Sequence, residues 1–407
     1  MNPWLRIFLP FAAGYYLSYL LRNVNAVIAP ELTRELGVSA ASLGLLTSAY
    51  LLAFGAFQLP LGILLDRYGP RRVEAALLLV AAAGSALFAV GGGLEELAVA
   101  RALIGLGVSA CLMASFKAFS MWFPPERQAS LNAAVMAAGG LGALTATTPL
   151  AWALPVAGWR GIFMVLALLA VAAAAGIFST PEKPGTAKRE TLGEQLRALG
   201  GIFRSRVFWR FAPQAALTTG GFIALQGLWA VPWLIEVNGY SRDSAAFHLL
   251  LASGAMLTGF VLLATMVTRV AKAGVPPQRI LAGGIGTGIA VMALIVADVG
   301  MTHALWFAMG LVFSVSNLAY ALLCSHFPGH LSGRVNTALN LAAFVGAFGL
   351  QWGIGVAADV LKTAGLSPVE AYRWTFGALC AAQAAAWGWF MFGARAVSPS
   401  AGTITAR

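Results

Sequence analysis

Polar residues recur on one helical face near the beginning of the chain. The set consists of Tyr15, Ser18, Tyr19 and Arg22 at positions i, i+3, i+4 and i+7, with Asn25 one turn later. The surrounding residues are apolar, and a guanidinium at the centre of a bilayer costs about 2.5–3.5 kcal/mol on insertion scales. Such a charge normally faces a protein interior or a watery cavity. Because no acidic residue is obviously placed to pair with Arg22, we expect an anionic substrate to be its partner.

Further candidates for a substrate site lie in later apolar segments. Lys117 is a second buried cation, unless it snorkels towards the nearby end of its helix. The second half of the chain offers amides and aromatics that could hold the uncharged body of a ligand. Ordinary hydrogen bonds between helices are the alternative for each of them. These candidates are Gln226, Trp229, Asn317, Tyr320 and Asn340.

The composition points to an all-α polytopic membrane protein. Of the 407 residues, 59% are hydrophobic and only 10% are charged, against about 25% charged residues in soluble domains. Cys111, Cys324 and Cys380 show no metal-ligand spacing and are interpreted as packing residues. Neither a P-loop nor a catalytic constellation is found, so we predict no enzyme activity, no cofactor and no metal. The basic residues are dispersed among loops, which argues against nucleic-acid binding.

Twelve apolar segments are long enough to cross a bilayer. They cover approximately residues 8–32, 42–65, 72–92, 96–121, 130–153, 160–179, 208–236, 244–267, 280–299, 303–327, 335–360 and 371–394. A long polar stretch separates the first six from the last six. We therefore expect a six-helix bundle at 1–179, a linker at 180–207, a second six-helix bundle at 208–395 and a tail at 396–407.

Lysine and arginine are concentrated in the loops on one side of this arrangement. The positive-inside rule then places both termini and the linker in the cytoplasm, without a cleavable signal peptide. Thr191 and Glu194 have the spacing of a capping box, and apolar residues follow at helical period. This pattern predicts an amphipathic linker helix on the inner membrane surface, with a simple tether as the alternative.

The loop after the second segment carries a specific motif. It reads Gly62-Ile-Leu-Leu-Asp66-Arg67-Tyr-Gly69-Pro-Arg71-Arg72. This stretch resembles the G-x-L-x-D-R-x-G-x-R-R signature of the major facilitator superfamily. Arg101-Ala-Leu-Ile-Gly105-Leu-Gly107 and Gly158-Trp159-Arg160 also resemble recurring features of that family.

The resemblance implies two pseudo-symmetric six-helix bundles that rock about a midplane substrate site. Gly62 is expected to let two helices approach closely, and Asp66 to face the N-terminus of the eleventh span, where the helix dipole favours a carboxylate. Arg67, Arg71 and Arg72 would add ion pairs to this cytoplasmic gate, or merely orient the protein in the membrane.

The first span also resembles that of the organophosphate and anion–cation symporter branches. In those branches an arginine at this place contacts substrate phosphate or carboxylate, which implies the same role for Arg22. Leu21 stands where the anion–cation symporters typically have an aspartate, and no Asp or Glu is expected near the centre of any span. Proton symport through another group, anion exchange and uniport all stay open.

The leading prediction is a secondary transporter of a small organic anion, either a carboxylate or a phosphorylated metabolite. We expect it to work as a monomer among the lipids of a bacterial cytoplasmic membrane. A coupling proton or a counter-anion is a further candidate partner. One alternative is an efflux carrier of drugs or amphiphiles, which Trp229 and Trp233 could bind. The other is a non-transporting sensor on the same fold.

Overall fold

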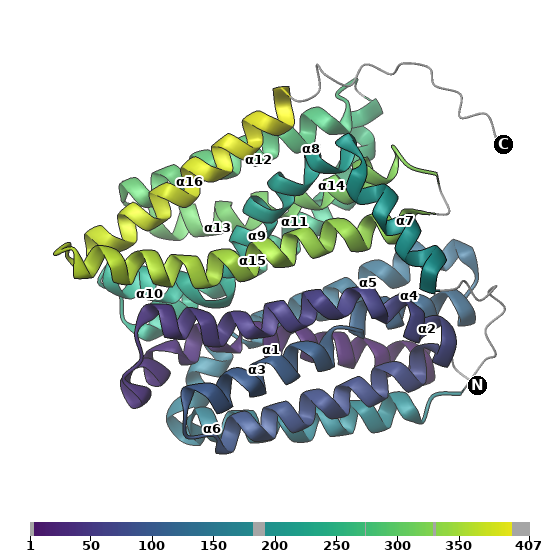
Figure 1. Ribbon diagram of the computed structural model, residues 1–407, viewed down its shortest axis with the longest axis horizontal. Coiled ribbons are helices and arrows are strands. Elements are labelled where there is room, and N and C mark those ends of the chain that lie inside the picture. Colours follow the sequence, from purple (N-terminus) through teal and green to yellow (C-terminus); the bar gives the residue numbers. More distant parts are fainter. Residues whose placement is uncertain (1–3, 182–191, 273, 329–330, 393–407) are drawn as a thin grey trace.

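The computed structural model describes residues 4–181, 192–272, 274–328 and 331–392, and the regular structure within these ranges is helical. The first half of the chain forms a short π-helical turn and six helices. These elements are η1 (Trp4–Phe8), α1 (Leu9–Leu36), α2 (Ala40–Val90), α3 (Leu94–Val108), α4 (Cys111–Trp122), α5 (Pro125–Thr145) and α6 (Thr148–Phe178). In Figure 1 they occupy the lower half of the molecule.

The second half of the chain occupies the upper half of Figure 1. It begins with α7 (Leu192–Arg204), α8 (Arg206–Gln214), η2 (Ala215–Thr219), α9 (Gly220–Ala224), η3 (Leu225–Trp229) and α10 (Ala230–Glu236). It continues with α11 (Arg242–Lys272), α12 (Pro277–Ala297), α13 (Thr302–Phe313), η4 (Ser314–Asn317), α14 (Leu318–Cys324), α15 (Ser332–Thr363) and α16 (Pro368–Phe392).

The helices follow the twelve expected segments once their breaks are taken into account. The long helix α2 contains the second and third segments, because the backbone reverses at Gly69, where φ is 79°. Gly158 divides α6 in the same way with φ of 63°. Residues that carry a side chain rarely adopt such positive φ values, so glycine is required at both corners.

Eight of the described helical stretches are apolar and long enough to cross a membrane by length and composition alone. Two of the expected spans fall outside this set, and features of their helices explain why. The helix α1 carries a polar face with Arg22, and the run from α8 to α10 is interrupted by the π-turns η2 and η3. Such π-turns insert an extra residue into a helix and are frequent at functional sites.

The two halves repeat the same close helix contacts. At four glycines an added Cβ would lie between 2.0 and 2.2 Å from the carbonyl oxygen of a neighbouring helix. Counted in spans, the contacts join the fourth span to the second and the fifth to the first, and again the tenth to the eighth and the eleventh to the seventh. The pairs are Gly105 with Tyr50, Gly142 with Tyr16, Gly310 with Ala252 and Gly346 with Ala216. This repetition identifies two pseudo-symmetric bundles.

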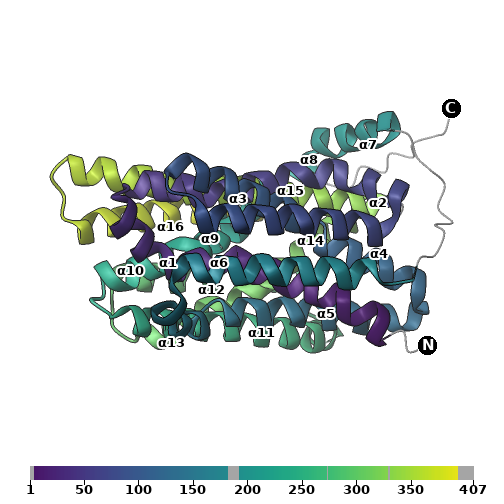
Figure 2. The same ribbon diagram turned by 90° about the horizontal axis from the view of Figure 1, so that it is seen from below.

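The beginning of α1 and the helix α7 lie at one end of the molecule, on the right in Figures 1 and 2, which we call the linker end. The opposite end, the far end, is closed by contacts between the two bundles. The backbone N–H of Ala41 donates to Asp359 Oδ2 at 2.7 Å. An added Cβ at Gly355 would lie 2.3 Å from the Ala40 carbonyl oxygen. An ion pair between Glu31 and Arg242 crosses the same seam.

The linker helix α7 does not have its whole apolar face on lipid. Ile202 is 1% exposed and belongs to an apolar cluster of the second bundle that includes Phe208 and Val335. Leu199 and Phe203 pack against the same cluster. The second bundle therefore covers these apolar residues of α7, and the position of this helix at the membrane surface stays a prediction.

Candidate functional site

Arg22 faces the seam between the two bundles, where aromatic rings surround its guanidinium. The guanidinium carbon lies 4.6 Å from the ring centroid of Tyr19, 5.1 Å from that of Phe54 and 5.2 Å from that of Phe344. Phe54 comes from α2 and Phe344 from α15, and their rings stack at 4.4 Å. Cation–π attraction of this kind stabilises a desolvated guanidinium.

The guanidinium has unused hydrogen-bonding capacity. Within the described part of the chain Arg22 forms no ion pair, and its Nε is buried without an acceptor. The hydroxyl of Tyr50 faces the guanidinium. Burying a cation without an anion costs free energy, so this position favours a negatively charged ligand.

A small pocket beside Arg22 is built by both bundles. Its empty volume is about 180 Å³, and in this conformation it has no room for a water molecule. The first bundle supplies Arg22, Thr47, Tyr50, Leu51 and Arg101, and the second supplies Ile223, Gly227 and Gln351. The site is therefore closed, and a ligand would enter only as the bundles move apart.

Arg101 brings a second positive charge to this pocket. It is 1% exposed, its Nη1 donates to the Leu21 carbonyl oxygen at 2.9 Å, and its guanidinium lies 4.8 Å from the Tyr50 ring centroid. The bond to the backbone of α1 supports a structural role. The charge nevertheless adds to the positive potential around Arg22.

Several of the predicted site residues gather near Arg22. Tyr15 and Tyr19 meet edge to face at 5.2 Å. Tyr320 lies within electrostatic range of Tyr19 and Arg22, and its hydroxyl donates to Asn340 Oδ1 at 3.1 Å. Asn25 is fully buried, and neither its amide nitrogen nor its oxygen has a hydrogen-bond partner among the described residues.

Other predicted site residues have structural partners instead. The amide of Gln226 donates to Ser253 Oγ at 3.0 Å inside the second bundle. The indole N–H of Trp229 donates to the Gln351 carbonyl oxygen at 2.8 Å, which places Trp229 in the far-end seam. Asn317 donates to the Ser314 carbonyl oxygen of its own turn. Lys117 is half-buried towards the end of α4.

The motif loop lies at the linker end. Gly69 makes the corner of α2, and Arg71 Nε donates to the Phe178 carbonyl oxygen at 2.7 Å. Arg67 and Arg72 are exposed. The side chain of Asp66 lies outside what the structure describes, so its expected contact with the eleventh span stays a prediction.

Gly62 does not make the expected close helix contact in this conformation. It is exposed, and an added Cβ would meet no atom within 4 Å.

Sequence reasoning did not select Tyr50, Phe54 and Phe344 for the site. Tyr50 stands four residues before Phe54, so a common helical face was a usable signal for α2. For Phe344 no such signal exists, because its meeting with Phe54 depends on how the bundles pack.

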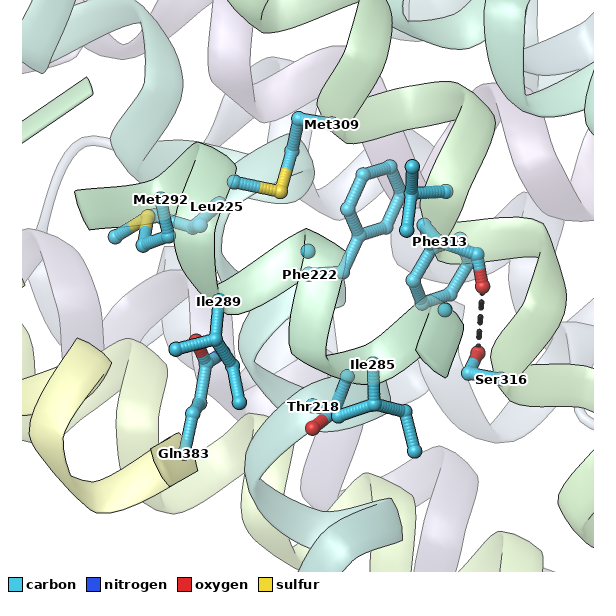
Figure 3. Close-up of a pocket in the computed structure, with 13 residues that line it drawn as sticks. Thr218, Phe222, Leu225, Ile285, Ile289, Met292, Met309, Phe313, Ser316 and Gln383 are labelled. Atoms are coloured by element: carbon cyan, nitrogen blue, oxygen red, sulfur yellow. Dashed lines mark hydrogen bonds between the residues drawn. The ribbon is translucent and has the colours of Figure 1, made fainter. Parts of the chain in front are cut away.

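Another pocket lies inside the second bundle and is a different site. Its empty volume is about 450 Å³, and Figure 3 shows Phe222, Phe313, Met292 and Met309 around it. Thr218, Ser316 and Gln383 are its polar residues, and none of the residues that line it is charged. It therefore offers nothing that would bind an anion.

Comparisons with known proteins agree with this architecture. A family model described as Major Facilitator Superfamily matches residues 11–350. A protein named as a probable sulfoacetate transporter from Cupriavidus necator is 28% identical over 37% of this chain and 35% of its own length. The hexuronate transporter of Escherichia coli is 26% identical over 57% of this chain and 58% of its own length. The matched regions thus span about a third and somewhat over half of these relatives.

A longer match and two solved structures complete the comparison. The hexuronate transporter of Bacillus subtilis is 23% identical over 88% of this chain and 93% of its own length. A bacterial homologue of the human lysosomal transporter Spinster, solved in an inward-facing and occupied conformation, has a TM-score of 0.74 at 16% identity, covering 98% of this chain and 100% of its own. A D-xylose–proton symporter has a TM-score of 0.73 at 17% identity, covering 95% and 97%.

Proposed function

The chain belongs to the Major Facilitator Superfamily, and on this premise we propose that it is a secondary transporter of small organic anions with Arg22 as the anion-binding residue. The observation that carries the proposal is the guanidinium between the two bundles, which has a buried Nε without an acceptor and no carboxylate partner in the described chain.

Transport would proceed by alternating access. The far end is closed in this conformation, so the anion would enter from the linker end and displace the rings around Arg22. A carboxylate can accept two parallel N–H bonds from a guanidinium, which favours a carboxylate or a similar planar group. Neutralising the buried charge would favour closure of the bundles around the ligand and subsequent opening at the other end.

Hydroxylated organic acids are the substrates we favour. The relatives are named for hexuronate, galacturonate, L-galactonate and sulfoacetate. Each of these is a small anion, and most carry several hydroxyl groups. In this chain the hydroxyls of Tyr19, Tyr50 and Tyr320 and the amide of Asn340 would hydrogen-bond such a sugar acid beside Arg22.

We further propose a bacterial cytoplasmic membrane as the location, with the linker end in the cytoplasm and the monomer as the working unit. The bacterial relatives support the location. The concentration of basic residues at the linker end, including Arg67 and Arg72, supports the orientation.

A ligand screen on the purified protein tests the proposed function. Galacturonate, L-galactonate and sulfoacetate would be tested for an increase in the thermal unfolding temperature, because a ligand that binds only the folded state stabilises it. A hit should then give counterflow of the labelled anion in proteoliposomes. Stabilisation by amphipathic cations but by no anion would overturn the proposal and favour the efflux alternative.

A further inference from the structure

A buried carboxyl group in the first bundle has no assigned role. Glu74 lies five residues after the corner at Gly69, in the second half of α2, and it is fully buried. Neither of its carboxylate oxygens has a hydrogen-bond partner among the described residues. The sequence analysis did not select it, because it stands at the beginning of the expected span 72–92 and not near its centre.

The carboxyl group fills a space that a glycine leaves free. A Cβ added at Gly14 of α1 would lie 2.5 Å from Glu74 Oε1 and 3.3 Å from Ile177 Cδ1 of α6. A side chain at this position of α1 would therefore collide with the acid. Glu74 and α1 are packed so closely that movement of one requires adjustment of the other.

The groups that face Glu74 do not neutralise a negative charge. From α4 the Cys111 thiol is the titratable neighbour. From α1 it faces Gly14, and from α6 it faces the apolar Ile177. On α2 itself, Arg71 lies one turn away and donates to the Phe178 carbonyl oxygen. The Cys111 thiol is at most a weak hydrogen-bond donor. An ionised carboxylate with no stronger donor and no counter-ion is strongly disfavoured at such a site, so the protonated acid is the form that fits this conformation.

A second pocket lies at the linker end, beside the same helices that surround this acid. Its empty volume is about 330 Å³, and Phe11, Arg71, Ala118 and Thr180 are among its lining residues. Phe11 stands three residues before Gly14, and Arg71 stands three residues before Glu74. Thr180 stands three residues after Ile177. These lining residues thus stand about one helical turn, roughly 5 Å along the helix axes, from the residues that surround the carboxyl group.

The acid is also connected to the anion site. Gly14 and Arg22 lie on the same helix α1, eight residues or roughly 12 Å apart along its axis. Cys111 lies within electrostatic range of Glu74, Tyr15 and Arg22. A shift of α1 that follows anion binding would thus be felt at Glu74.

We propose that Glu74 is a proton-binding site that couples proton movement to transport of the anion bound at Arg22, an inference that rests on the proposed function. In the present conformation Glu74 holds its proton. When α1 moves, the acid O–H bond breaks, the proton passes to water in the linker-end pocket, and the electron pair stays on the carboxylate. The ionised form must regain a proton before α1 can pack against it again.

The test uses proteoliposomes with labelled galacturonate and an entrapped pH indicator. In the wild type an imposed proton gradient should drive accumulation, and a galacturonate gradient should move protons. Glu74→Gln keeps the shape of the side chain but cannot release a proton. We expect it to lose gradient-driven accumulation and proton movement while counterflow of galacturonate persists. Glu95→Gln, the same change at an exposed position, should behave as the wild type.

The possible outcomes separate the two proposals. Wild-type protein that neither binds galacturonate nor any other tested anion defeats the proposed function itself. Counterflow without proton movement in the wild type, or unchanged proton coupling in Glu74→Gln, defeats only the role of Glu74. If Glu74→Gln does not fold, Glu74→Asp takes its place. A shifted pH profile of uptake supports the proposal, and an unchanged profile overturns it.

Discussion

At the scale of single residues, the half-buried Arg22 and the buried Arg101 have different roles in binding negative charge. Arg101 is tied to the backbone of α1 by its bond to Leu21, whereas no backbone carbonyl or carboxylate of the described residues holds Arg22. We therefore expect the Arg22 guanidinium to be the one that changes partners during a transport cycle. Arg101 holds the helix that carries it and strengthens the field at the pocket.

Substitutions of Arg22 should show how much of the anion affinity depends on its positive charge and how much on the planar shape of its guanidinium. Arg22→Ala removes a buried charged hydrogen-bonding partner, which typically costs about 2–5 kcal/mol of binding free energy. Arg22→Lys keeps the charge but loses the planar fork, so an intermediate loss of affinity is expected. Titration of galacturonate followed by calorimetry would measure both. Arg34→Ala, at an exposed position of the far end, is the control, and wild-type affinity in Arg22→Ala would refute the assignment.

The helical face of the first span was predictable, and its partners were not. Spacing alone placed Tyr15, Tyr19 and Arg22 together, and the structure brings them together. Gln226 and Trp229 were also selected as site residues, yet they hydrogen-bond to Ser253 and to the Gln351 backbone. A periodicity within one helix cannot show whether a polar side chain meets the cavity or a neighbouring helix.

At the scale of elements, the contact between α2 and α15 decides whether the far end is open. Gly355→Ala would place a methyl group against the Ala40 carbonyl oxygen and keep this seam from closing. We expect slower transport and faster labelling of a Thr47→Cys reporter by a membrane-impermeant maleimide, with the native cysteines replaced. Gly353→Ala is the matched control, because an added Cβ there meets nothing within 4 Å. Equal labelling in both variants would contradict this function of the seam.

A second contact joins the last turn of α1 to the part of α6 that follows the corner at Gly158. Glu35 accepts hydrogen bonds from Trp159 Nε1 at 2.7 Å and from Arg160, and these bonds hold the pKa of its carboxyl below the ordinary value. The contact therefore stabilises the fold above the pKa of Glu35 in the unfolded chain. This stabilisation is lost as the pH falls through the lower pKa of the folded state.

Replacement of this acid should thus have a pH-dependent effect. Glu35→Gln is expected to lower the free energy of unfolding at neutral pH by no more than about 1 kcal/mol, since the pair is exposed. The difference from the wild type should vanish in acid. Thermal unfolding in detergent across a pH series measures it, with Glu95→Gln as the control. A constant difference at all pH values would rule out the ionised carboxylate as the cause.

The sequence predicted where most helices begin and end, but it did not predict the irregular turns within them. The corners at Gly69 and Gly158 coincide with loops expected from polarity and from glycine. The π-turns η2 and η3 left no trace in the apolar pattern, because an extra residue in a continuously apolar helix changes no periodicity that can be read. The covered face of α7 was missed for a related reason, since an amphipathic pattern does not distinguish lipid from protein.

At the scale of the whole molecule, the orientation in the membrane can be tested with two glycines. Gly92 at the far end and Gly193 in α7 are both exposed, with no atom within 4 Å of an added Cβ. In a background without native cysteines, Gly92→Cys should react with an impermeant maleimide in intact cells. Gly193→Cys should react only after the membrane is permeabilised. The reverse pattern would invert the proposed topology.

The repeated glycine contacts explain why the overall architecture could be inferred from one chain. A six-plus-six arrangement follows from span counting and from the long linker, and the two bundles are held by equivalent close approaches at Gly105 and Gly310. The site could be inferred only in part, because its walls come from both bundles. Phe344 and Gln351 reach Arg22 through the relative placement of the halves.

The aromatic rings near the Arg22 guanidinium also affect which ions can cross the protein when no substrate is bound. The rings of Tyr19, Phe54 and Phe344 lie near this guanidinium, and the pocket beside it has no room for water. In this conformation that pocket offers no hydrated path to chloride or other abundant inorganic ions. Only a guest large enough to part the rings would gain access to the charge. The same aromatic screen that conceals the site at rest would thus spare the cell a wasteful leak of its ion gradients.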